Sequence, residues 1–323
     1  MSELALIERI AARTALRPGT ILGIGDDAAV IAAGGDTVVT HDMLVEGVHF
    51  RLSTTGARDL GAKALAVNLS DLAAMGVRPV AATVGLGIPP GMTEAEIDEL
   101  YAGLEAVAAR HGVTIAGGDV TSAPVLVLAV TAIGRPQEDV APVLRTGARA
   151  GDLLCVTGPL GAAAAGLLLL EDPALLPGLP QRPSLVAAHR RPVPRVQEGL
   201  ALARAGAHAL MDISDGLALD ARRLAVASGL RARIPLDVLP LARGVREVAA
   251  ATGASAQILA ATGGEDYELL AALDTDALGR MREDGPRLVV VGRLVDEDEP
   301  GLDLLGADGE PVTPGRLGWE HDG

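Results

Sequence analysis

Residues 58–76 read RDLGAKALAVNLSDLAAMG. Apolar residues recur in this stretch with the period of an α-helix, and Gly76 follows as a helix stop. One aspartate, Asp71, lies inside the apolar pattern, flanked by Leu69 and Leu72. Ionised carboxylates are rarely buried unless they are paired or bound to a metal. The stretch therefore predicts a core helix in which Asp71 has a functional role.

The rest of the chain alternates between strand-like and helical segments without a strictly repeating βαβ pattern. Strands are expected at residues 37–44, 80–88, 113–119 (with a turn at its end), 124–135, 153–158, 207–213, 232–239, within 258–273 and at 287–294. One helix is expected at residues 3–14. Another is expected to begin after Thr93, which forms a capping box with Glu96, and to end at about His111. The Pro-rich residues 179–195 are expected to form an ordered loop.

The polar residues 136–152, which contain prolines and glycines, read as a linker. They divide the chain into an N-terminal domain at residues 1–137 and a C-terminal domain at residues 138–323. The mixture of strands and helices in both parts predicts the fold class α/β (α+β), with two domains.

Composition excludes several classes of protein. The chain has 323 residues, of which 49% are hydrophobic, so a large core can form. A formal net charge of -15 and only 1% aromatic residues argue against a nucleic-acid partner. The single cysteine, Cys155, excludes an intrachain disulfide and is expected in the core. The sequence shows no signal-peptide pattern and no apolar stretch that could span a membrane, which predicts a cytoplasmic protein.

Acidic residues recur at the ends of apolar segments, next to glycines or at helix starts: Asp26, Asp27, Asp42, Asp71, Asp119, Asp212, Asp215, Glu265 and Asp266. Taken singly, most of them are typical of turns and helix caps. The stretch GIGDDAAV (23–30) also resembles the glycine fingerprint of a dinucleotide-binding fold. However, Asp26 and Asp27 would stand where the anionic pyrophosphate must bind, and this argues against a Rossmann dehydrogenase.

The acidic residues indicate a cation site. Two carboxylates about 4 Å apart repel each other by roughly 4 kcal/mol at an effective dielectric constant near 20. Several of them could converge only around cations, because a domain is stable by only about 5–15 kcal/mol. Oxygen ligands favour Mg²⁺ over Zn²⁺, and Mg²⁺ commonly carries substrate phosphates. The chain contains neither a Walker A motif nor the protein-kinase motifs, so phosphoryl transfer would need another scaffold.

Six motifs follow one another along the chain: GIGDDAAV (23–30), THDMLVEGVHF (40–50), KALAVNLSDLAAMG (63–76), AGGDVT (116–121), MDISDGL (211–217) and GGEDYEL (263–269). Together they resemble thiamine-monophosphate kinase, and the match continues to the final LGW. Relatives of this family include aminoimidazole ribonucleotide synthetase, selenophosphate synthetase and a hydrogenase maturation protein. VEGVHF and GGEDYEL favour the thiamine enzyme over these relatives.

The resemblance implies a two-domain aminoimidazole ribonucleotide synthetase-like fold, with an N-terminal domain whose sheet forms a homodimer. It implies direct phosphoryl transfer from ATP to thiamine monophosphate, assisted by several Mg²⁺ ions, without a phosphoenzyme. No general base is expected, since the attacking phosphate is already anionic.

The resemblance also implies roles for individual residues. Metal-ligating positions are expected at Asp27, Thr40, His41, Asp42, Asp71, Asp119, Asp212 and Asp215. ATP-contacting positions are expected at Tyr101, Gly118, Asp119, Arg145 and Ser214. Substrate-contacting positions are expected at His49, Glu265 and Trp319.

Some of these positions have a second interpretation. Tyr101 could be a core residue of its helix, and Trp319 could pack against the protein instead of a thiazolium ring. His41 stands where the family commonly has a small hydroxyl residue. If the family binds the metal through the backbone at this position, His41 changes little; if it binds through the side chain, His41 would alter the contact. Lys63, the sole lysine, either orients the Asp71 helix, touches phosphate or is solvated.

Two other functions compete with the kinase. One is a related enzyme that uses ATP to activate a different acceptor, and the other is a non-catalytic nucleotide- or metal-binding sensor. The complete set of acidic residues argues against the sensor, since a degenerate binder need not retain every ligand.

Overall fold

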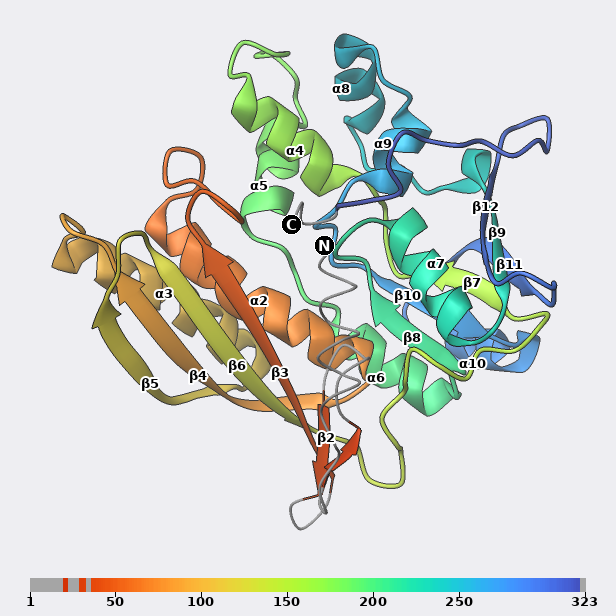
Figure 1. Cartoon of the computed structure of the whole chain (residues 1–323), viewed down its shortest axis with the longest axis horizontal. Coiled ribbons are helices and arrows are strands. Elements are labelled where there is room, and N and C mark those ends of the chain that lie inside the picture. Colours follow the sequence, from red (N-terminus) through yellow and green to blue (C-terminus); the bar gives the residue numbers. More distant parts are fainter. Residues whose placement is uncertain (1–19, 23–28, 33–35, 320–323) are drawn as a thin grey trace.

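The computed structural model describes residues 20–22, 29–32 and 36–319. Two six-stranded sheets, each with helices packed against it, lie side by side (Figure 1). This arrangement agrees with the α/β class predicted from the sequence. The helix expected at residues 3–14 lies outside the described residues. None of the described helices is long and apolar enough to cross a lipid bilayer.

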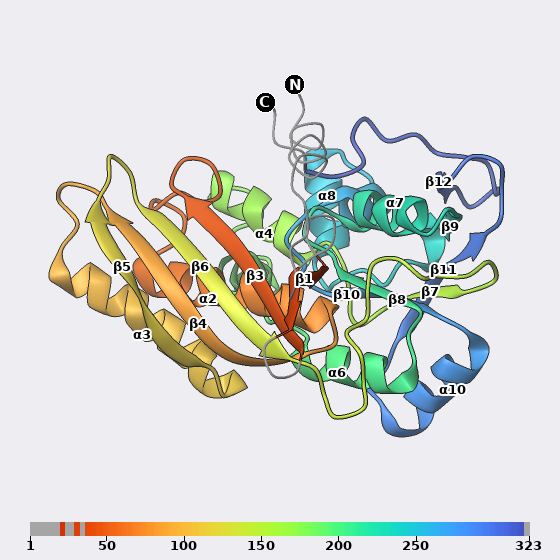
Figure 2. The same ribbon diagram turned by 60° about the horizontal axis from the view of Figure 1, so that its bottom comes forward.

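The first sheet contains β1 (Thr20–Leu22), β2 (Ala29–Ala32), β3 (Asp36–Val45), β4 (Arg78–Ile88), β5 (Thr114–Ser122) and β6 (Val127–Arg135). Its strand order is β1-β2-β3-β6-β4-β5, and the described neighbours are antiparallel except for β4 and β5. Helices α2 (Ala57–Ala74) and α3 (Glu94–His111) cover one face of this sheet (Figures 1 and 2).

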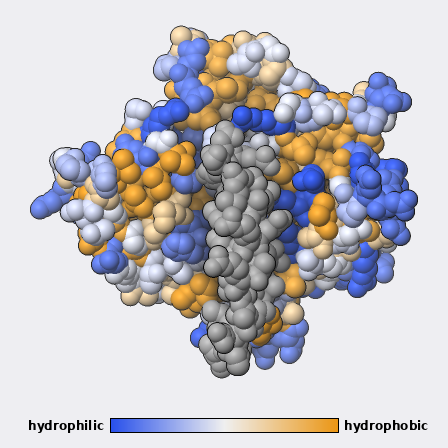
Figure 3. All heavy atoms as spheres, viewed as in Figure 1, coloured by the Kyte–Doolittle hydropathy of each residue, from blue (hydrophilic) through white to orange (hydrophobic). Residues whose placement is uncertain are grey.

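Strand β3 shows how the sequence sets the two faces of the sheet. Val38, Thr40 and Leu44 are buried, whereas His41 and Met43 are exposed. Residues two apart on a strand share a face, so the buried set points toward α2 and the exposed set toward the open side. No described helix covers the open side, and Figure 3 shows hydrophobic atoms gathered over it. Met43 is 50% exposed there.

Helix α3 begins and ends as the sequence predicts. The Thr93 side chain accepts a hydrogen bond from the backbone N–H of Glu96, and the Glu96 side chain accepts one from the Thr93 N–H at 2.8 Å. This capping box satisfies two N–H groups that the first turn would otherwise leave open. Gly112 ends the helix in the left-handed conformation, with φ 67°.

Helices α2 and α3 touch through two glycines. A Cβ added to Gly61 would lie 1.8 Å from the Leu100 carbonyl oxygen, and one added to Gly103 would lie 2.0 Å from the Arg58 carbonyl oxygen. No side chain fits at either place, so glycine is what allows the two backbones to approach.

The second sheet contains β7 (Leu153–Val156), β8 (Ala209–Asp212), β9 (Arg231–Pro235), β10 (Leu269–Leu273), β11 (Val289–Val295) and β12 (Gly301–Leu305), in the order β12-β9-β11-β7-β10-β8. The helices of this half are α4 (Ala162–Glu171), α5 (Arg182–Arg190), α6 (Val196–Ala205), α7 (Leu217–Ala227), α8 (Val245–Thr252), α9 (Ala256–Thr262) and α10 (Thr275–Asp284), with the 3₁₀ turn η1 (Leu236–Val238). Helices α6 and α10 pack on one face of the sheet, and α7 and α9 pack on the other.

One hydrophobic core joins the two halves of the molecule. It contains α2 residues such as Leu69 together with Cys155 and Leu269 from the second sheet. Helix α6 packs on the end of α2 so closely that a Cβ on Gly199 would lie 2.1 Å from the Ala73 carbonyl oxygen. Cys155 is fully buried, as its apolar surroundings in the sequence predict.

Several local expectations were wrong. The Pro-rich residues 179–195 contain helix α5, since Pro183 stands in its first turn, where proline is tolerated. The turn expected at residues 117–119 is absent, because β5 continues through the glycines to Ser122 alongside β4. The strand expected at residues 232–239 ends at Pro235 as β9, and the 3₁₀ turn η1 follows it. Strands β1, β2 and β12 were not predicted; β12 is short and pairs with β9.

Candidate active site

Strand β3 and helix α2 bring the first predicted ligands together. Thr40 Oγ1 donates a hydrogen bond to Asp71 Oδ2 at 2.5 Å. The backbone N–H of Asp42 donates to Asn68 Oδ1 at 3.2 Å, and Asn68 Nδ2 donates to the Ala64 carbonyl. Asp42 shares the face of Thr40, because the two are two residues apart on the strand. Asp42 and Asp71 therefore lie at one contact between β3 and α2.

The second half of the chain adds Asp212 to the same helix. Ser70 Oγ donates a hydrogen bond to Asp212 Oδ2 at 2.6 Å. Ser70 is fully buried on α2, and Asp212 is 2% exposed at the end of β8. Since Ser70 precedes Asp71 directly, α2 holds carboxylates from both halves of the molecule.

Tyr267 lies among these acidic residues. Burial raises the pKa of its phenol well above the ordinary value, and the negative charges of Glu265, Asp42, Asp212 and Asp71 raise it further. Four carboxylates therefore act electrostatically on this phenol. We call Asp42, Asp71, Asp212 and Glu265 the acidic cluster. Tyr267 itself was not singled out from the sequence, although its place within GGEDYEL was a usable signal.

The GGEDYEL loop is fixed on the DISDG turn by its backbone. The N–H of Glu265 donates to the Ser214 carbonyl at 2.7 Å, and the N–H of Tyr267 donates to the Ile213 carbonyl at 2.9 Å. Glu265 and Tyr267 have φ angles of 68° and 49°, in the left-handed region that non-glycine residues rarely adopt. Such residues cost about 1–3 kcal/mol each and cluster at functional sites.

Glu265 is held by two basic side chains. Lys63 Nζ lies 2.6 Å from Glu265 Oε1, and His189 Nδ1 lies 2.8 Å from Glu265 Oε2. Burial alone would raise the pKa of Glu265, but the charge of Lys63 and the contact with His189 lower it to about 2. Lys63 is 1% exposed, so the interpretation of it as a solvated lysine was wrong.

Asp215 is engaged by an arginine. Arg223 Nη1 forms an ion pair with Asp215 and donates to Asp220 Oδ1 at 3.0 Å. Burial would lower the pKa of Arg223, but Asp215 and Asp220 raise it, while the nearby charge of Arg145 acts against them. Arg145, predicted to contact ATP, therefore lies close to the Asp215 turn.

The predicted residues Ser214 and Trp319 meet at the same turn. The Ser214 carbonyl accepts the hydrogen bond from the backbone N–H of Glu265, and the backbone N–H of Trp319 donates to the Asp215 carbonyl at 2.9 Å. The tail of the chain thus folds back onto the DISDG turn. Trp319 is 54% exposed, so this residue is not part of the core.

The two histidines of THDMLVEGVHF take different positions. His49 Nδ1 accepts a hydrogen bond from the Val45 N–H at 3.1 Å, which makes Nε2 the protonated nitrogen of the neutral ring. His41 lies on the open face of the sheet, with Nδ1 2.8 Å from Thr131 Oγ1. The His41 side chain therefore points away from the acidic cluster, and a metal contact at this position would involve its backbone.

The whole chain is similar to known proteins. Residues 25–135 match the family described as AIR synthase related protein, N-terminal domain, and residues 149–304 match AIR synthase related protein, C-terminal domain. A thiamine-monophosphate kinase of Mycobacterium tuberculosis is 39% identical over 327 residues, covering 98% of this chain and 95% of the relative. The chain belongs to the thiamine-monophosphate kinase family.

Solved structures agree with this membership of the thiamine-monophosphate kinase family. AaThiL complexed with AMPPCP and TMP has a TM-score of 0.87 at 30% identity, covering 99% of this chain and 97% of AaThiL. A thiamine-monophosphate kinase from Stenotrophomonas maltophilia K279a has a TM-score of 0.77 at 40% identity, covering 97% of this chain and 98% of that chain. The family and the fold class inferred from the sequence motifs are thereby confirmed.

Gly118 and Asp119, which are predicted to bind ATP, lie apart from the acidic cluster. The sheet register aligns Asp119 of β5 with Gly85, Ala129 and Met43 on successive strands. Three strand spacings separate Asp119 from Met43, which amounts to about 14 Å. Asp119 and its neighbour Gly118 are therefore on the far edge of the sheet within one chain.

Tyr101 is also distant from the cluster. It lies on α3 and packs against the core next to Leu100, which touches Gly61 near the start of α2. Asp71 follows Gly61 by ten residues, or about 15 Å along the helix axis. Asp27, the remaining predicted metal ligand, lies outside the described residues.

The glycine turn before α4 binds a side chain of the protein itself. The Gly161 N–H donates to Asp266 Oδ2 at 2.6 Å and the Ala163 N–H donates to Asp266 Oδ1 at 3.2 Å. Burial raises the pKa of Asp266 to about 7, although these hydrogen bonds act in the other direction. Because Asp266 already occupies this helix start, the start is not open to a phosphate.

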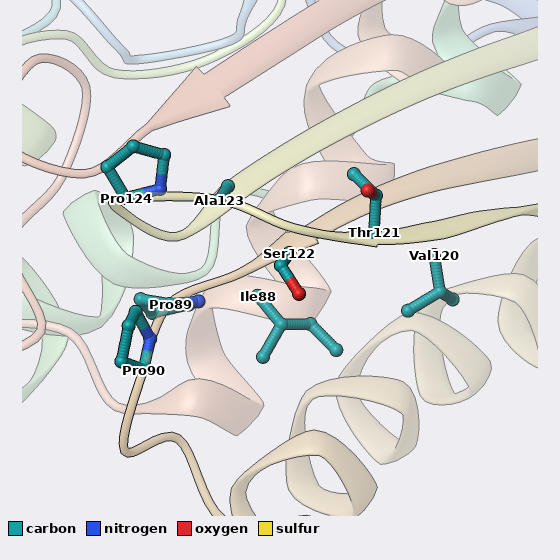
Figure 4. A pocket seen from close by; sticks show the side chains of 8 residues that line it. All are labelled: Ile88, Pro89, Pro90, Val120, Thr121, Ser122, Ala123 and Pro124. Carbon is teal, nitrogen blue, oxygen red and sulfur yellow. The ribbon is translucent and has the colours of Figure 1, made fainter.

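Figure 4 shows a pocket that is separate from the acidic cluster. It has a volume of about 590 Å³ and is lined by residues 88–90 and 120–124, at the ends of β4 and β5. Its lining contains prolines, valine and small polar residues without an ionisable side chain. This pocket therefore lacks the groups that phosphoryl transfer requires.

Within the described part of the chain, no three acidic, histidine or cysteine side chains are close enough to form a complete metal site. The acidic cluster nevertheless provides carboxylate and hydroxyl oxygens, the donors that Mg²⁺ prefers. Four carboxylates acting on one phenol also create the negative potential that attracts a cation. The residues present therefore fit Mg²⁺, with further ligands supplied from outside the cluster.

Proposed function

We propose that the protein transfers the γ-phosphoryl group of ATP to thiamine monophosphate, giving thiamine diphosphate and ADP. The observation that carries this proposal is the similarity to thiamine-monophosphate kinases over 98% of the chain. The complex of AaThiL, which holds the ATP analogue AMPPCP together with TMP, supports ATP as co-substrate. The relatives bear out the activity predicted from the sequence motifs.

The acidic cluster is assigned the role of binding Mg²⁺. Asp42, Asp71 and Asp212 would hold the ions, with Thr40 orienting Asp71 through its hydrogen bond. Mg²⁺ held by these residues would supply neutralisation of the charge on the transferring phosphoryl group. The protein supplies position and electrostatics, and the anionic phosphate of the substrate attacks without a general base. Asp27, Thr40, His41, Asp119 and Asp215 remain proposed as further ligands.

The substrates are assigned to neighbouring residues. Glu265, His49 and Trp319 are proposed to hold the thiamine part, with the Trp319 ring stacking on it. Ser214 and Arg145, at and near the DISDG turn, are proposed to contact ATP. Tyr101, Gly118 and Asp119 complete the proposed ATP contacts.

The proposed partner of the chain is a second copy of itself. The first sheet has an open face, and the edge strand β5 is exposed along nearly its whole length. Open apolar faces and unpaired edges both favour association. A strict monomer at micromolar concentration in sedimentation experiments would count against this assembly.

Three further assignments complete the proposal. The N-terminal domain comprises residues 1–137 and the C-terminal domain residues 138–323. The protein acts in the cytoplasm without binding nucleic acid or membrane. Its high negative charge supports the exclusion of nucleic acid.

The first experiment measures formation of thiamine diphosphate from thiamine monophosphate, ATP and Mg²⁺, with a chelator-treated sample beside it. Product that disappears with the chelator is the expected result. ATP binding without product would move the search to another phosphate acceptor. Binding without any Mg²⁺-dependent ATP turnover would identify a non-catalytic sensor instead.

A further inference from the structure

Helix α2 buries the sole lysine of the chain. Lys63 is 1% exposed and is the largest fully buried side chain among the described residues. An ammonium group removed from water needs a counter-charge, and Lys63 Nζ lies 2.6 Å from Glu265 Oε1. An aliphatic residue would fill the same space without the cost of desolvation, so the charge itself needs an explanation.

The other oxygen of the same carboxylate is held by the second half of the chain. His189 on α5 lies with Nδ1 2.8 Å from Glu265 Oε2. The Lys63 and His189 side chains are 2% and 8% exposed, whereas that of Glu265 is 29% exposed. Glu265 is therefore the member of the three that reaches the surface, and it is held from behind on both oxygens.

The backbone adds to this fixation. Glu265 has the left-handed φ of 68°, and its N–H is bound to the Ser214 carbonyl. Its charge acts on Tyr267 together with the charges of the acidic cluster, which places it beside that cluster. The result is a rigid, partly exposed anion next to the proposed site of phosphoryl transfer.

Resting on the function proposed above, we propose that Lys63 and His189 are positioning residues that hold the Glu265 carboxylate for the cationic ring system of thiamine monophosphate. A carboxylate near the phosphates would repel them if its charge were uncompensated. Lys63 offsets that charge at longer range, so more distant phosphates are repelled less, whereas a thiazolium cation in direct contact with the exposed carboxylate still meets the negative end of the pair. Lys63 does not touch phosphate itself, because its ammonium is buried and already paired.

The test is steady-state kinetics on Lys63→Met and His189→Gln in the full chain. We expect the KM for thiamine monophosphate to rise about tenfold or more for Lys63→Met and in the same direction for His189→Gln. The KM for ATP is expected to stay within about twofold, since uniform binding of only one substrate is lost. A contact between Lys63 and ATP would raise the KM for ATP instead.

A double-mutant cycle separates positioning from a merely structural role. In the Glu265→Gln background, Lys63→Met is expected to cause no further rise in the KM for thiamine monophosphate, because its effect passes through Glu265. The matched control is Arg195→Met. Arg195 Nε donates to Glu268 Oε2 at 2.8 Å, so this variant also removes a buried charge pair to the same loop, but not to Glu265. Its KM for thiamine monophosphate should remain that of the wild type.

The outcomes are distinct. If the wild type forms thiamine diphosphate while folded Lys63→Met keeps its KM for thiamine monophosphate, the positioning role is overturned and the kinase function stands. Additive effects in the cycle, or an equal rise in the control, also overturn it. If the wild type forms no thiamine diphosphate, the proposed function and this inference fail together. Should Lys63→Met not fold, His189→Gln with its own cycle against Glu265→Gln decides the question.

Discussion

Helices α2 and α3 have the same length of 18 residues and lie side by side, yet they differ in what surrounds them. Helix α3 buries five residues on one side and leaves the others partly or fully exposed to solvent. Helix α2 buries 14 residues, among them Lys63, Asn68 and Ser70, because the sheet, α3 and the second half of the chain enclose it. A polar residue on α3 is satisfied by water, whereas each polar residue on α2 needs a protein partner.

This difference separates function from stability. Three buried polar residues of α2, namely Asn68, Ser70 and Lys63, contact Asp42, Asp212 and Glu265, all of which belong to the acidic cluster. The polar contacts of α3 are local or lie at the surface, such as the exposed Arg58–Glu99 pair. Substitutions of the buried polar residues of α2 should therefore change catalysis, whereas substitutions on α3 away from Tyr101 should change only stability.

The largest effect is expected from Asp71→Ala. Loss of this carboxylate should lower kcat at least about 10³-fold, since preorganised charge stabilisation contributes on this scale. Folding should be retained, because one source of repulsion in the cluster is removed, and circular dichroism checks this. Asp98→Ala makes the same change at an exposed position on α3 and should leave kcat within about twofold. A similar fall in kcat in both variants would contradict the proposal that α2 serves catalysis and α3 serves stability.

Gly61→Ala tests the contact between the two helices. The added Cβ would meet the Leu100 carbonyl oxygen at 1.8 Å, so the backbones must separate. Overpacking of this kind should lower the free energy of unfolding by about 3 kcal/mol, measured by urea denaturation. The control is Gly279→Ala on α10, where nothing lies within 4 Å. This variant should be about 0.5–1 kcal/mol more stable than the wild type.

The ion pair between α2 and Glu265 predicts a dependence of stability on pH. Folding lowers the pKa of Glu265 from 4.5 to about 2. A lowered carboxyl pKa stabilises the fold fully above pH 4.5, and this stabilisation is lost as the pH falls toward 2. The difference in unfolding free energy between the wild type and Glu265→Gln should therefore shrink by on the order of 3 kcal/mol over that range. A difference that does not vary between pH 5 and pH 2 would contradict the pairing.

The smallest effect is expected from Thr93→Ala, which removes the capping box of α3. Loss of a helix N-cap costs about 1 kcal/mol of stability, measurable as a shift of the urea midpoint. Because α3 lies apart from the acidic cluster, kcat and both KM values should stay unchanged. A clear fall in kcat would mean that α3 does contribute to the site.

The same two helices show how far the sequence could be interpreted. The start and end of α3 were predicted because caps and the C-terminal glycine are local signals, readable within a few residues. Helix α2 was also predicted from its apolar period, and Asp71 is a partly buried charge within its otherwise buried residues. The roles of Lys63 and Tyr267 were not predicted, because their partners are about 200 residues away or depend on a loop conformation.

Other misses have similar causes. Strand β5 continues through Gly117 and Gly118 because β4 pairs with it, a contact that the glycine-rich sequence does not reveal. The motifs placed Asp42, Asp71, Asp212 and Glu265 in one site, and in the structure the charges of all four act on the Tyr267 phenol. They also placed Asp119 there, but the order of strands in the sheet depends on long-range pairing that no local pattern encodes.

The core that runs through α2 has a consequence for dividing the protein. Leu69 on α2 belongs to the same continuous core as Leu269 and Cys155, and Gly199 sits directly on the α2 backbone. A cut between residues 137 and 138 would expose these apolar surfaces on both products. Neither fragment should be soluble by itself, although the two produced together should reassemble around α2. A chimera that joins one half of this protein to the other half of a homologue should then fold only if the homologue preserves the residues that pack on α2.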